Sequence, residues 1–516
     1  ALYIVTALLD CTKAFNRMDR RLIIAKLQKE GVEGPLLEWL TGYFHERWIC
    51  VTVDNFTSDV ARTANGGPQG SVLTLMCWLV YVNDICASFP TGEPNGDNPD
   101  PLPDASLLMD DCATWVSGDD PLTVIDTLNL RLRHIYDWSV FNAMIFDFKK
   151  FNILSMGHNP IPLDMRSSLK FGPNSPPWVK SARFIGAHLD PLLTFKQEIK
   201  IITAKVKKGM HFISPFSHFA RGYHPTTLET NFRVYVWPRF SFTEPLWIFR
   251  IKTPFHYTAD FNYGYKTKFE KLESLYIGCG RKILGAHPTT ANLAVMVRIG
   301  WLPLEYKYAL NAIMWTLRII NTCAGPTLET FYNSISTEPQ LLKLTATIQP
   351  AIDFLCHLNK YSDVNLLHVP LKRAKAAIQT AMYNELTAIW KHDPSCKQLH
   401  NIHSDWRPRV YCKRSISRIT ISCYHTFACG FGYLRSWSHH IGLSPSPNCR
   451  HGCNVSETAE HILLDCPFYV SARNSICELC VSHGLDISQK TFLTESILQY
   501  RVEKLLRQFI DSTKHD

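Results

Sequence analysis

The sequence predicts an α+β fold in which an antiparallel sheet packs on helices and a long helical region follows. The chain begins with a continuous run of strand-forming residues, Leu2 to Leu9, and such runs are typical of a central strand covered on both faces. Strand and helix patterns mix up to about residue 195, whereas helical spacing dominates from 196 to about 320. At 516 residues the chain is too long for one core, so we expect two to four domains.

The composition is that of an ordinary globular protein, with 46% hydrophobic and 19% charged residues. A formal net charge of +9 is compatible with a polyanionic partner without requiring one. The 17 cysteines are scattered, which favours free thiols in a reducing compartment. No apolar run approaches the length of a membrane span and no signal peptide is visible. We therefore expect an intracellular protein, in cytoplasm and nucleus, with no membrane partner.

Local signals predict the elements that follow the first strand. Asp19 is expected to cap a helix that Gly31 ends, and Pro35 to open a second helix. An alternating strand is expected over 48–53, with a turn at Asp54. These signals depend only on neighbouring residues, so they say nothing of which strands pair.

A glycine-rich loop over 65–71 leads into an apolar helix expected over 72–85, with Ser71 as its cap. Such a loop at a helix start is typical of a phosphate or nucleotide contact. A plain connecting loop is the alternative. Residues 91–104 are rich in Pro, Gly and Asp and are expected to form a surface loop.

Two adjacent carboxylates, Asp110 and Asp111, interrupt an apolar strand-forming run. Because neighbouring side chains of a strand face opposite ways, the pair predicts the tip of a tight hairpin. Two like charges this close need a cation to offset them, and a hard divalent ion such as Mg²⁺ is the usual partner. An acidic, solvated turn is the alternative. Asp10, at the end of the first strand, is a further carboxylate expected to face a cleft.

Further along, an amphipathic helix is expected over 121–139, and a short strand over 184–190 whose glycine marks a bulge or a close approach. Lys149 and Lys150 stand between aromatic residues. Five lysines between 196 and 208 predict either a solvated helix face or a contact with a nucleic-acid backbone.

Four residues near the C-terminus have the spacing of a metal site: Cys449, Cys453, His461 and Cys466. Three thiols and an imidazole suit tetrahedral Zn²⁺, although a chance grouping is possible in a chain with 17 Cys and 21 His. His461 is expected on a helix over 458–464. Three nearby residues are candidates for base stacking or phosphate contact: Arg435, Trp437 and Arg450.

Five motifs occur in the order found in reverse transcriptases: Asp10-x₄-Phe15, Gly67-Pro68-Gln69-Gly70-Ser71, Leu108-Met109-Asp110-Asp111, the Lys149-Lys150 segment and Phe184-Ile185-Gly186-x₂-Leu189-Asp190. They resemble the palm motifs of these enzymes. Their residue sequences, including ALLDCTKAF and RFIGAHLD, most resemble those of non-LTR (LINE-like) retrotransposons of the Jockey type. Residues 283–286 and 300–305 resemble the thumb of those elements, and the Cys-Cys-His-Cys cluster resembles their terminal zinc knuckle.

The resemblance implies a right-hand polymerase palm over 1–195, with the fingers largely missing and the chain truncated at its N-terminus. A helical thumb over 196–325, a helical connector over 326–430 and a C-terminal zinc-knuckle region over 431–516 would follow. The implied activity is that of an RNA-directed DNA polymerase, which extends a DNA primer on an RNA template with dNTPs. The reaction would be a two-metal nucleotidyl transfer.

The resemblance also assigns the metal ligands. Asp10, Asp110 and Asp111 would be the catalytic residues and would hold two Mg²⁺ ions. Asp10 and Asp110 would bridge both ions, and Asp111 would support the site less directly. The C-terminal cluster would hold a structural Zn²⁺ through Cys449, Cys453, His461 and Cys466.

Four residues are expected at the nucleotide. Phe15 would lie under the incoming sugar and select deoxynucleotides, because a bulky ring there clashes with a 2′-hydroxyl. Gln69 and Gly70 would meet the nucleotide, and Lys150 would protonate or steady the pyrophosphate, with Lys149 as the second choice.

Two alternatives of other classes stand beside the polymerase. One is a decayed remnant that binds nucleic acid without chemistry, for which the drifted motif positions Asn16 and Leu75 argue. The other is a zinc-dependent interaction module with an incidental palm. Nothing in the sequence predicts the oligomeric state.

Overall fold

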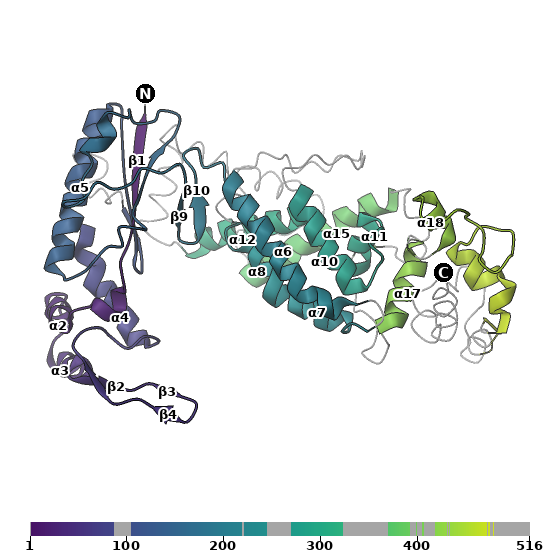
Figure 1. Cartoon of the computed structure of the whole chain (residues 1–516), viewed down its shortest axis with the longest axis horizontal. Coiled ribbons are helices and arrows are strands. Elements are labelled where there is room, and N and C mark those ends of the chain that lie inside the picture. The colour runs from purple at the N-terminus through teal and green to yellow at the C-terminus, as the bar shows by residue number, and fades with distance from the viewer. Residues whose placement is uncertain are drawn as a thin grey trace. The chain divides into compact units, whose positions relative to one another are not determined.

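The computed structural model describes residues 2–86, 105–218, 221–244, 270–322, 370–392, 418–430 and 434–471, with isolated positions at 399, 405–406, 432, 473–474 and 478. The described chain mixes helices with small antiparallel sheets (Figure 1). It divides into two compact units, Ala1–Glu198 and Ile199–Asp516. The surface loop expected over 91–104 lies outside the described residues.

A four-stranded antiparallel sheet forms the centre of the first unit, in the order β6-β7-β1-β8. Its strands are β1 (Tyr3–Asp10), β6 (Ala105–Leu108), β7 (Asp111–Gly118) and β8 (Asn152–Met156). The predicted first strand is confirmed, and it is an interior strand because β7 and β8 pair on its two sides. Val5 and Leu9 enter the main core, whereas Leu8 packs in a smaller cluster. Burial of successive side chains near the end of the strand explains why apolar residues follow one another there.

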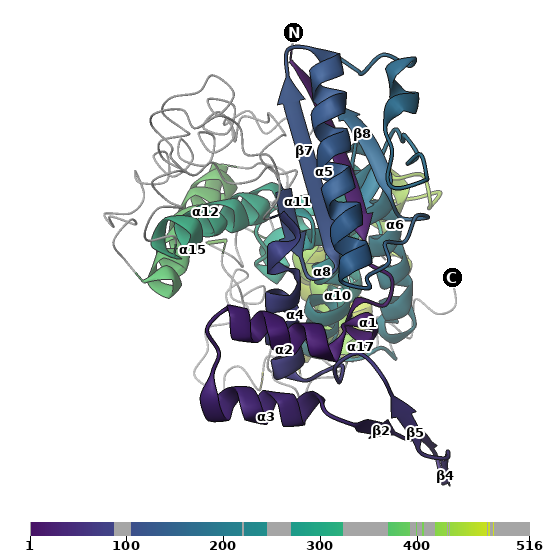
Figure 2. The same ribbon diagram turned by 90° about the vertical axis from the view of Figure 1, so that its left-hand side faces the viewer.

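Helices cover one face of this sheet. Helix α5 (Pro121–Phe141) lies along β7 and β1 (Figure 2), and its buried Leu128, Leu132 and Ile135 recur at helical spacing. Each such side chain contributes about 1.5–3 kcal/mol when fully buried. The helix predicted over 121–139 is confirmed, and Asp120 caps it by accepting a hydrogen bond from the Thr123 amide at 2.8 Å.

The two helices predicted near the N-terminus are also confirmed. Helix α2 (Arg20–Lys29) begins after Asp19, whose carboxylate accepts from two backbone amides of the first turn. Gly31 follows it with a φ of 89°, a left-handed conformation that glycine adopts without strain. Helix α3 (Gly34–Phe44) has Pro35 in its first turn. Helix α4 (Val72–Val82) and the short α1 (Ala14–Arg17) complete the set.

Three local predictions in this unit were wrong in detail. The strand expected over 48–53 is two short strands, because β2 (Arg47–Ile49) pairs with β5 (Ala61–Thr63) and β3 (Thr52–Val53) pairs with β4 (Phe56–Thr57). The strand expected over 184–190 is a hairpin of β9 (Ala182–Phe184) and β10 (Ala187–Leu189). Its turn residues Ile185 and Gly186 both have positive φ. Ser71 precedes α4 but makes no capping bond; it accepts a hydrogen bond from the Tyr43 hydroxyl instead.

The chain after residue 195 is helical in its described part, as predicted for 196–320. Its helices are α6 (Lys196–Ile213), α7 (Pro225–Asn231), α8 (Trp237–Ser241), α10 (Glu270–Leu284), α11 (Asn292–Ile299), α12 (Leu304–Thr322), α15 (Leu371–His392), α17 (Arg418–Cys429) and α18 (Arg435–His440). None of the helices described in this chain combines the length and the apolar character needed to cross a membrane.

Three aromatic donors hold the segment between α11 and α12. Tyr383 donates to the carbonyl of Gly300 at 3.1 Å, and Trp406 donates to the carbonyl of Trp301 at 3.0 Å. Tyr276 donates to the carbonyl of Leu302 at 3.2 Å. These bonds satisfy consecutive backbone acceptors in a buried segment, so they tie separate parts of the second unit together.

Candidate functional site

Three aspartates lie at one end of the central sheet. Asp10 is the last residue of β1 and stands in register with Asp111, the first residue of β7. Asp110 occupies the turn of the β6–β7 hairpin beside Met109, whose φ is 59°. The amide of Cys11 donates to the carbonyl of Asp110 at 3.2 Å, which ties this turn to the end of β1. The predicted hairpin is therefore confirmed, and it brings Asp111 opposite Asp10.

The carboxylates at this end of the sheet act on one another. Burial raises the pKa of Asp111, and the charges of Asp10 and Asp110 raise it further, against the opposing influence of Lys150 and Arg183. Burial, together with the same three-carboxylate field, raises the pKa of the neighbouring Cys11 thiol to about 12. The Cys11 side chain is consequently a neutral part of the core.

A lysine already pairs with the most enclosed of these carboxylates. Lys150 Nζ forms an ion pair with Asp10 Oδ2; the Asp10 side chain is 12% exposed and the Lys150 side chain 64%. Among the described residues, only the C-terminal Cys/His cluster brings three or more potential metal-ligand atoms within 4.8 Å of one another. The three aspartates are therefore neighbours in the fold, but their oxygens do not converge on one point as the ligand atoms of that cluster do.

Three of the four residues predicted to meet a nucleotide line one groove of about 490 Å³, whereas the fourth, Lys150, does not line it and pairs with Asp10. Phe15, Gln69 and Gly70 all line it. The loop over 65–71 lies on α1, where the Gly67 amide donates to the carbonyl of Phe15 at 3.1 Å. A Cβ at Gly66 would lie 2.7 Å from that carbonyl oxygen, and its φ is 81°, so glycine is required there by packing.

Sequence reasoning missed Trp78, which connects this groove to the acidic hairpin. Its ring lies 5.3 Å from that of Phe15, and its indole nitrogen donates to the carbonyl of Met109 at 2.9 Å. The side chain is fully buried. An apolar helix gives no sign that one of its aromatic residues will make this hydrogen bond, so the residue looked like ordinary core.

The lysines predicted to form a basic face are exposed on α6. They are Lys196, Lys200, Lys205, Lys207 and Lys208. Five exposed ammonium groups on one helix fit a solvated surface and a polyanion contact equally, so both interpretations stand.

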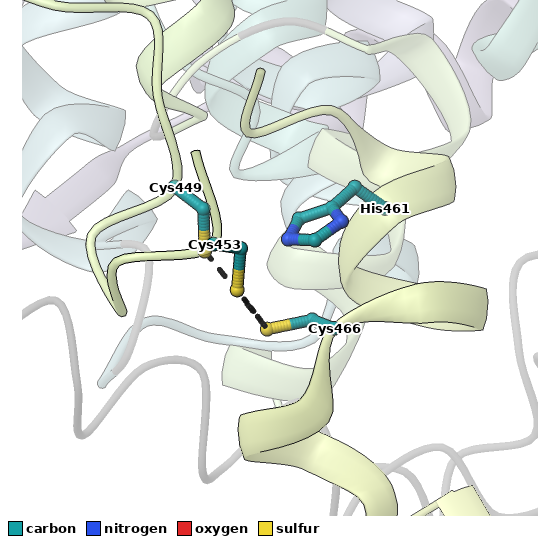
Figure 3. Close-up of side chains that lie close together, drawn as sticks. All are labelled: Cys449, Cys453, His461 and Cys466. Atoms are coloured by element: carbon teal, nitrogen blue, oxygen red, sulfur yellow. Dashed lines mark hydrogen bonds between the residues drawn. The ribbon is translucent and has the colours of Figure 1, made fainter. Parts of the chain in front are cut away.

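The C-terminal cluster forms a candidate metal centre (Figure 3). The ligand atoms of Cys449, Cys453, His461 and Cys466 all lie within 4.8 Å of one another. Cys466 Sγ is 3.9 Å from Cys449 Sγ and 3.8 Å from Cys453 Sγ. Tetrahedral Zn²⁺ with bonds of about 2.3 Å places its sulfur ligands about 3.8 Å apart. The buried His461 Nε2 has no hydrogen-bond partner, which leaves it available as the fourth ligand.

Local turns position these ligands. The Cys449 amide donates to the carbonyl of Val455 at 2.8 Å, and Gly452, with a φ of 76°, turns the chain between the first two cysteines. His461 begins a single helical turn, η8 (His461–Asp465), close to the helix predicted there. The Cys466 amide donates back to the carbonyl of His461 at 2.7 Å. Four ligands from 18 neighbouring positions thus converge through short-range bonds alone.

A buried ion pair braces the metal loop. Arg450 donates to both carboxylate oxygens of Glu457, at 2.8 and 2.6 Å. The amide of Arg435 donates to the same carboxylate at 2.9 Å. Burial alone would raise the pKa of Glu457, but these bonds hold it below its usual value. The sequence-based interpretation of Arg450 as a phosphate contact is therefore wrong, because its guanidinium is enclosed. Trp437 donates to Thr289 Oγ1 at 2.8 Å.

A second charged group missed by sequence reasoning is Lys307, on α12. Its ammonium lies 3.4 Å from the ring centre of Trp237. Three more rings lie within 6 Å of it: Phe232, Tyr276 and Trp301. Burial lowers the pKa of Lys307 to about 7, whereas the rings favour its charged form. The rings come from separate segments, so no local spacing indicates this site.

In comparisons with known proteins, no family model matches this chain and no curated protein matches it. The resemblance to reverse transcriptases thus depends on the ordered motifs.

Proposed function

We propose that this chain is the RNA-directed DNA polymerase of a non-LTR retrotransposon, with a polymerase palm in its first unit. The observation that carries the proposal is the register of Asp10 with Asp111, next to Asp110 at the hairpin turn. Two motifs that are distant in the sequence thereby supply three carboxylates to one end of an antiparallel sheet. Neighbouring carboxylates at the end of a sheet are unfavourable without a cation, which favours a role in metal binding.

The proposed ligands of Mg²⁺ are Asp10, Asp110 and Asp111. When bound, such ions activate an attacking hydroxyl and stabilise charge that develops on phosphate oxygens. The chain's own contribution is to position the reactants. Phe15 and Gln69 line one groove and would hold the incoming nucleotide, with the Phe15 ring excluding a 2′-hydroxyl.

The proposed partners are an RNA template, a DNA primer and dNTPs. Five exposed lysines on α6 support a polyanionic partner. The C-terminal cluster would hold a structural Zn²⁺, and this assignment is supported by the sulfur separations of 3.8 and 3.9 Å.

A second candidate is a remnant that binds nucleic acid and performs no chemistry. Two observations favour it. Among the described residues, the ligand atoms of the C-terminal cluster converge within 4.8 Å, whereas the oxygens of the three carboxylates do not. In addition, Asp10 is paired with Lys150. The basic helix face would then be the functional feature, and binding would weaken steeply with salt.

Primer extension tests the proposal. The full chain, a DNA primer annealed to an RNA template, dNTPs and Mg²⁺ are combined, and extended primer is measured. The Asp110→Ala variant is expected to lose at least about a hundredfold in rate, the scale on which a single charge-stabilising group acts. Asp137→Ala, an exposed carboxylate of α5, is the matched control and should extend normally. An Asp110→Ala chain as fast as wild type would refute the polymerase.

A salt titration separates the two candidates. Template binding is measured by fluorescence anisotropy from low to physiological salt. Binding together with Mg²⁺-dependent extension supports the polymerase. Binding with a steep salt dependence and no extension by the wild-type chain supports the remnant.

A further inference from the structure

Lys150 is fixed at the acidic end of the sheet by the backbone around it. It ends a turn in which its amide donates to the carbonyl of Asp147 at 2.9 Å, and the Asp147 amide donates to the carbonyl of Asp10 at 2.8 Å. These backbone bonds attach the turn to Asp10, the last residue of β1. The Lys150 side chain therefore begins close to the Asp10 carboxylate with which it pairs. Its ion pair with Asp10 joins positions 140 residues apart in the sequence.

We propose that Lys150 acts as a resident cation for Asp10, which a divalent metal ion must displace in order to bind there. The inference rests on the proposed function in that it takes the three aspartates as metal ligands. It goes beyond that function because it assigns the lysine a role before any nucleotide is present.

The electrostatics of this end of the sheet explain the need for such a cation. Asp10, Asp110 and Asp111 repel one another, and Asp10 has the least access to water that could screen it. The Lys150 ammonium forms an ion pair with Asp10, the most enclosed of the three. The ammonium thus offsets part of the repulsion until a stronger charge arrives.

The Lys150 side chain can move away from Asp10. Its side chain is 64% exposed, and a lysine ammonium is a compact charge on a flexible stem. An ammonium supplies one positive charge, whereas a divalent ion supplies two and can contact several carboxylates at once. Displacement therefore requires only rotation of an exposed side chain, after which Lys150 is free to meet a phosphate.

Mn²⁺ binding tests this inference on the full chain, loaded first with Zn²⁺ so that the thiol cluster is filled. Free Mn²⁺ is counted by electron paramagnetic resonance. Lys150→Met is expected to bind Mn²⁺ up to about fivefold more tightly than wild type, the range given by an exposed ion pair. Lys150→Arg, which keeps the charge, should stay close to wild type. Lys29→Met, at an exposed lysine that ends α2, should leave the affinity unchanged.

Each outcome has a clear meaning. Equal or weaker Mn²⁺ binding by Lys150→Met, or binding that survives Asp10→Asn unchanged, would overturn the inference. Primer extension is scored separately. Tighter Mn²⁺ binding by Lys150→Met, with no primer extension by the wild-type chain, would support the role of Lys150 as a resident cation and reject the polymerase. Mg²⁺-dependent extension, with the same Mn²⁺ affinity in Lys150→Met and wild type, would support the polymerase and reject that role of Lys150.

Discussion

The two candidate metal sites of this chain differ in how closely their ligand atoms lie together. At the C-terminal cluster, four ligand atoms converge within 4.8 Å. At the end of the central sheet, three carboxylates are neighbours in the fold, yet their oxygens do not converge in this way, and one of them is paired with Lys150.

Ligand charge explains the difference. Burial raises the pKa of Cys449 to about 12 and also raises that of Cys466, which favours the neutral form of these two thiols and lets them lie close together. Carboxylates are ionised near neutral pH and repel one another. A thiol site can therefore be formed by turns alone, whereas a carboxylate site needs a cation to close it.

The largest expected effect comes from breaking the cluster. Cys466→Ser replaces a completely buried thiol ligand with a poor zinc ligand, and structural zinc sites contribute about 10–16 kcal/mol of apparent binding free energy. We expect zinc content, measured by plasma mass spectrometry, to fall from one ion per chain to nearly none. Cys50→Ser, at an exposed cysteine, should retain the metal. A zinc-free wild-type chain purified with zinc present would contradict the site itself.

The second-largest effect tests whether the cluster depends on the buried ion pair between Arg450 and Glu457. Glu457→Gln leaves Arg450 buried without a counter-charge, which costs about 3–5 kcal/mol for a buried pair. We expect one zinc per chain to remain but to be released to a coloured chelator much faster than from wild type. Glu460→Gln, at an exposed neighbour, is the control. Release at the wild-type rate would mean that the turns hold the ligands without this pair.

The contrast between local and distant contacts also explains what the sequence could predict. The cluster, the Asp19 cap of α2, the helix over 121–139 and the Asp110 hairpin depend on residues near one another in the chain, and these predictions held. Whether 48–53 is one strand or two depends on pairing with β4 and β5. The bond between Lys150 and Asp10 depends on the sheet order. No periodicity encodes such contacts, so they became visible only in the fold.

The smallest effect concerns repulsion among the carboxylates. The pKa of Asp111 is raised above its ordinary 3.8 in the folded chain, so the folded state binds more protons than the unfolded state as pH rises from about 4. Stability must then fall across that window and stay lower above it. Asp111→Asn removes this cost. We expect urea unfolding of the zinc-loaded chain, without other divalent ions, to show a variant more stable by less than about 1 kcal/mol at pH 7, with a gain that shrinks as the pH is lowered towards 5. Asp137→Asn should show no such pH-dependent gain. A variant less stable than wild type at pH 7 would mean that attraction from Lys150 and Arg183 outweighs the repulsion, and that this end of the sheet is already balanced without a metal ion.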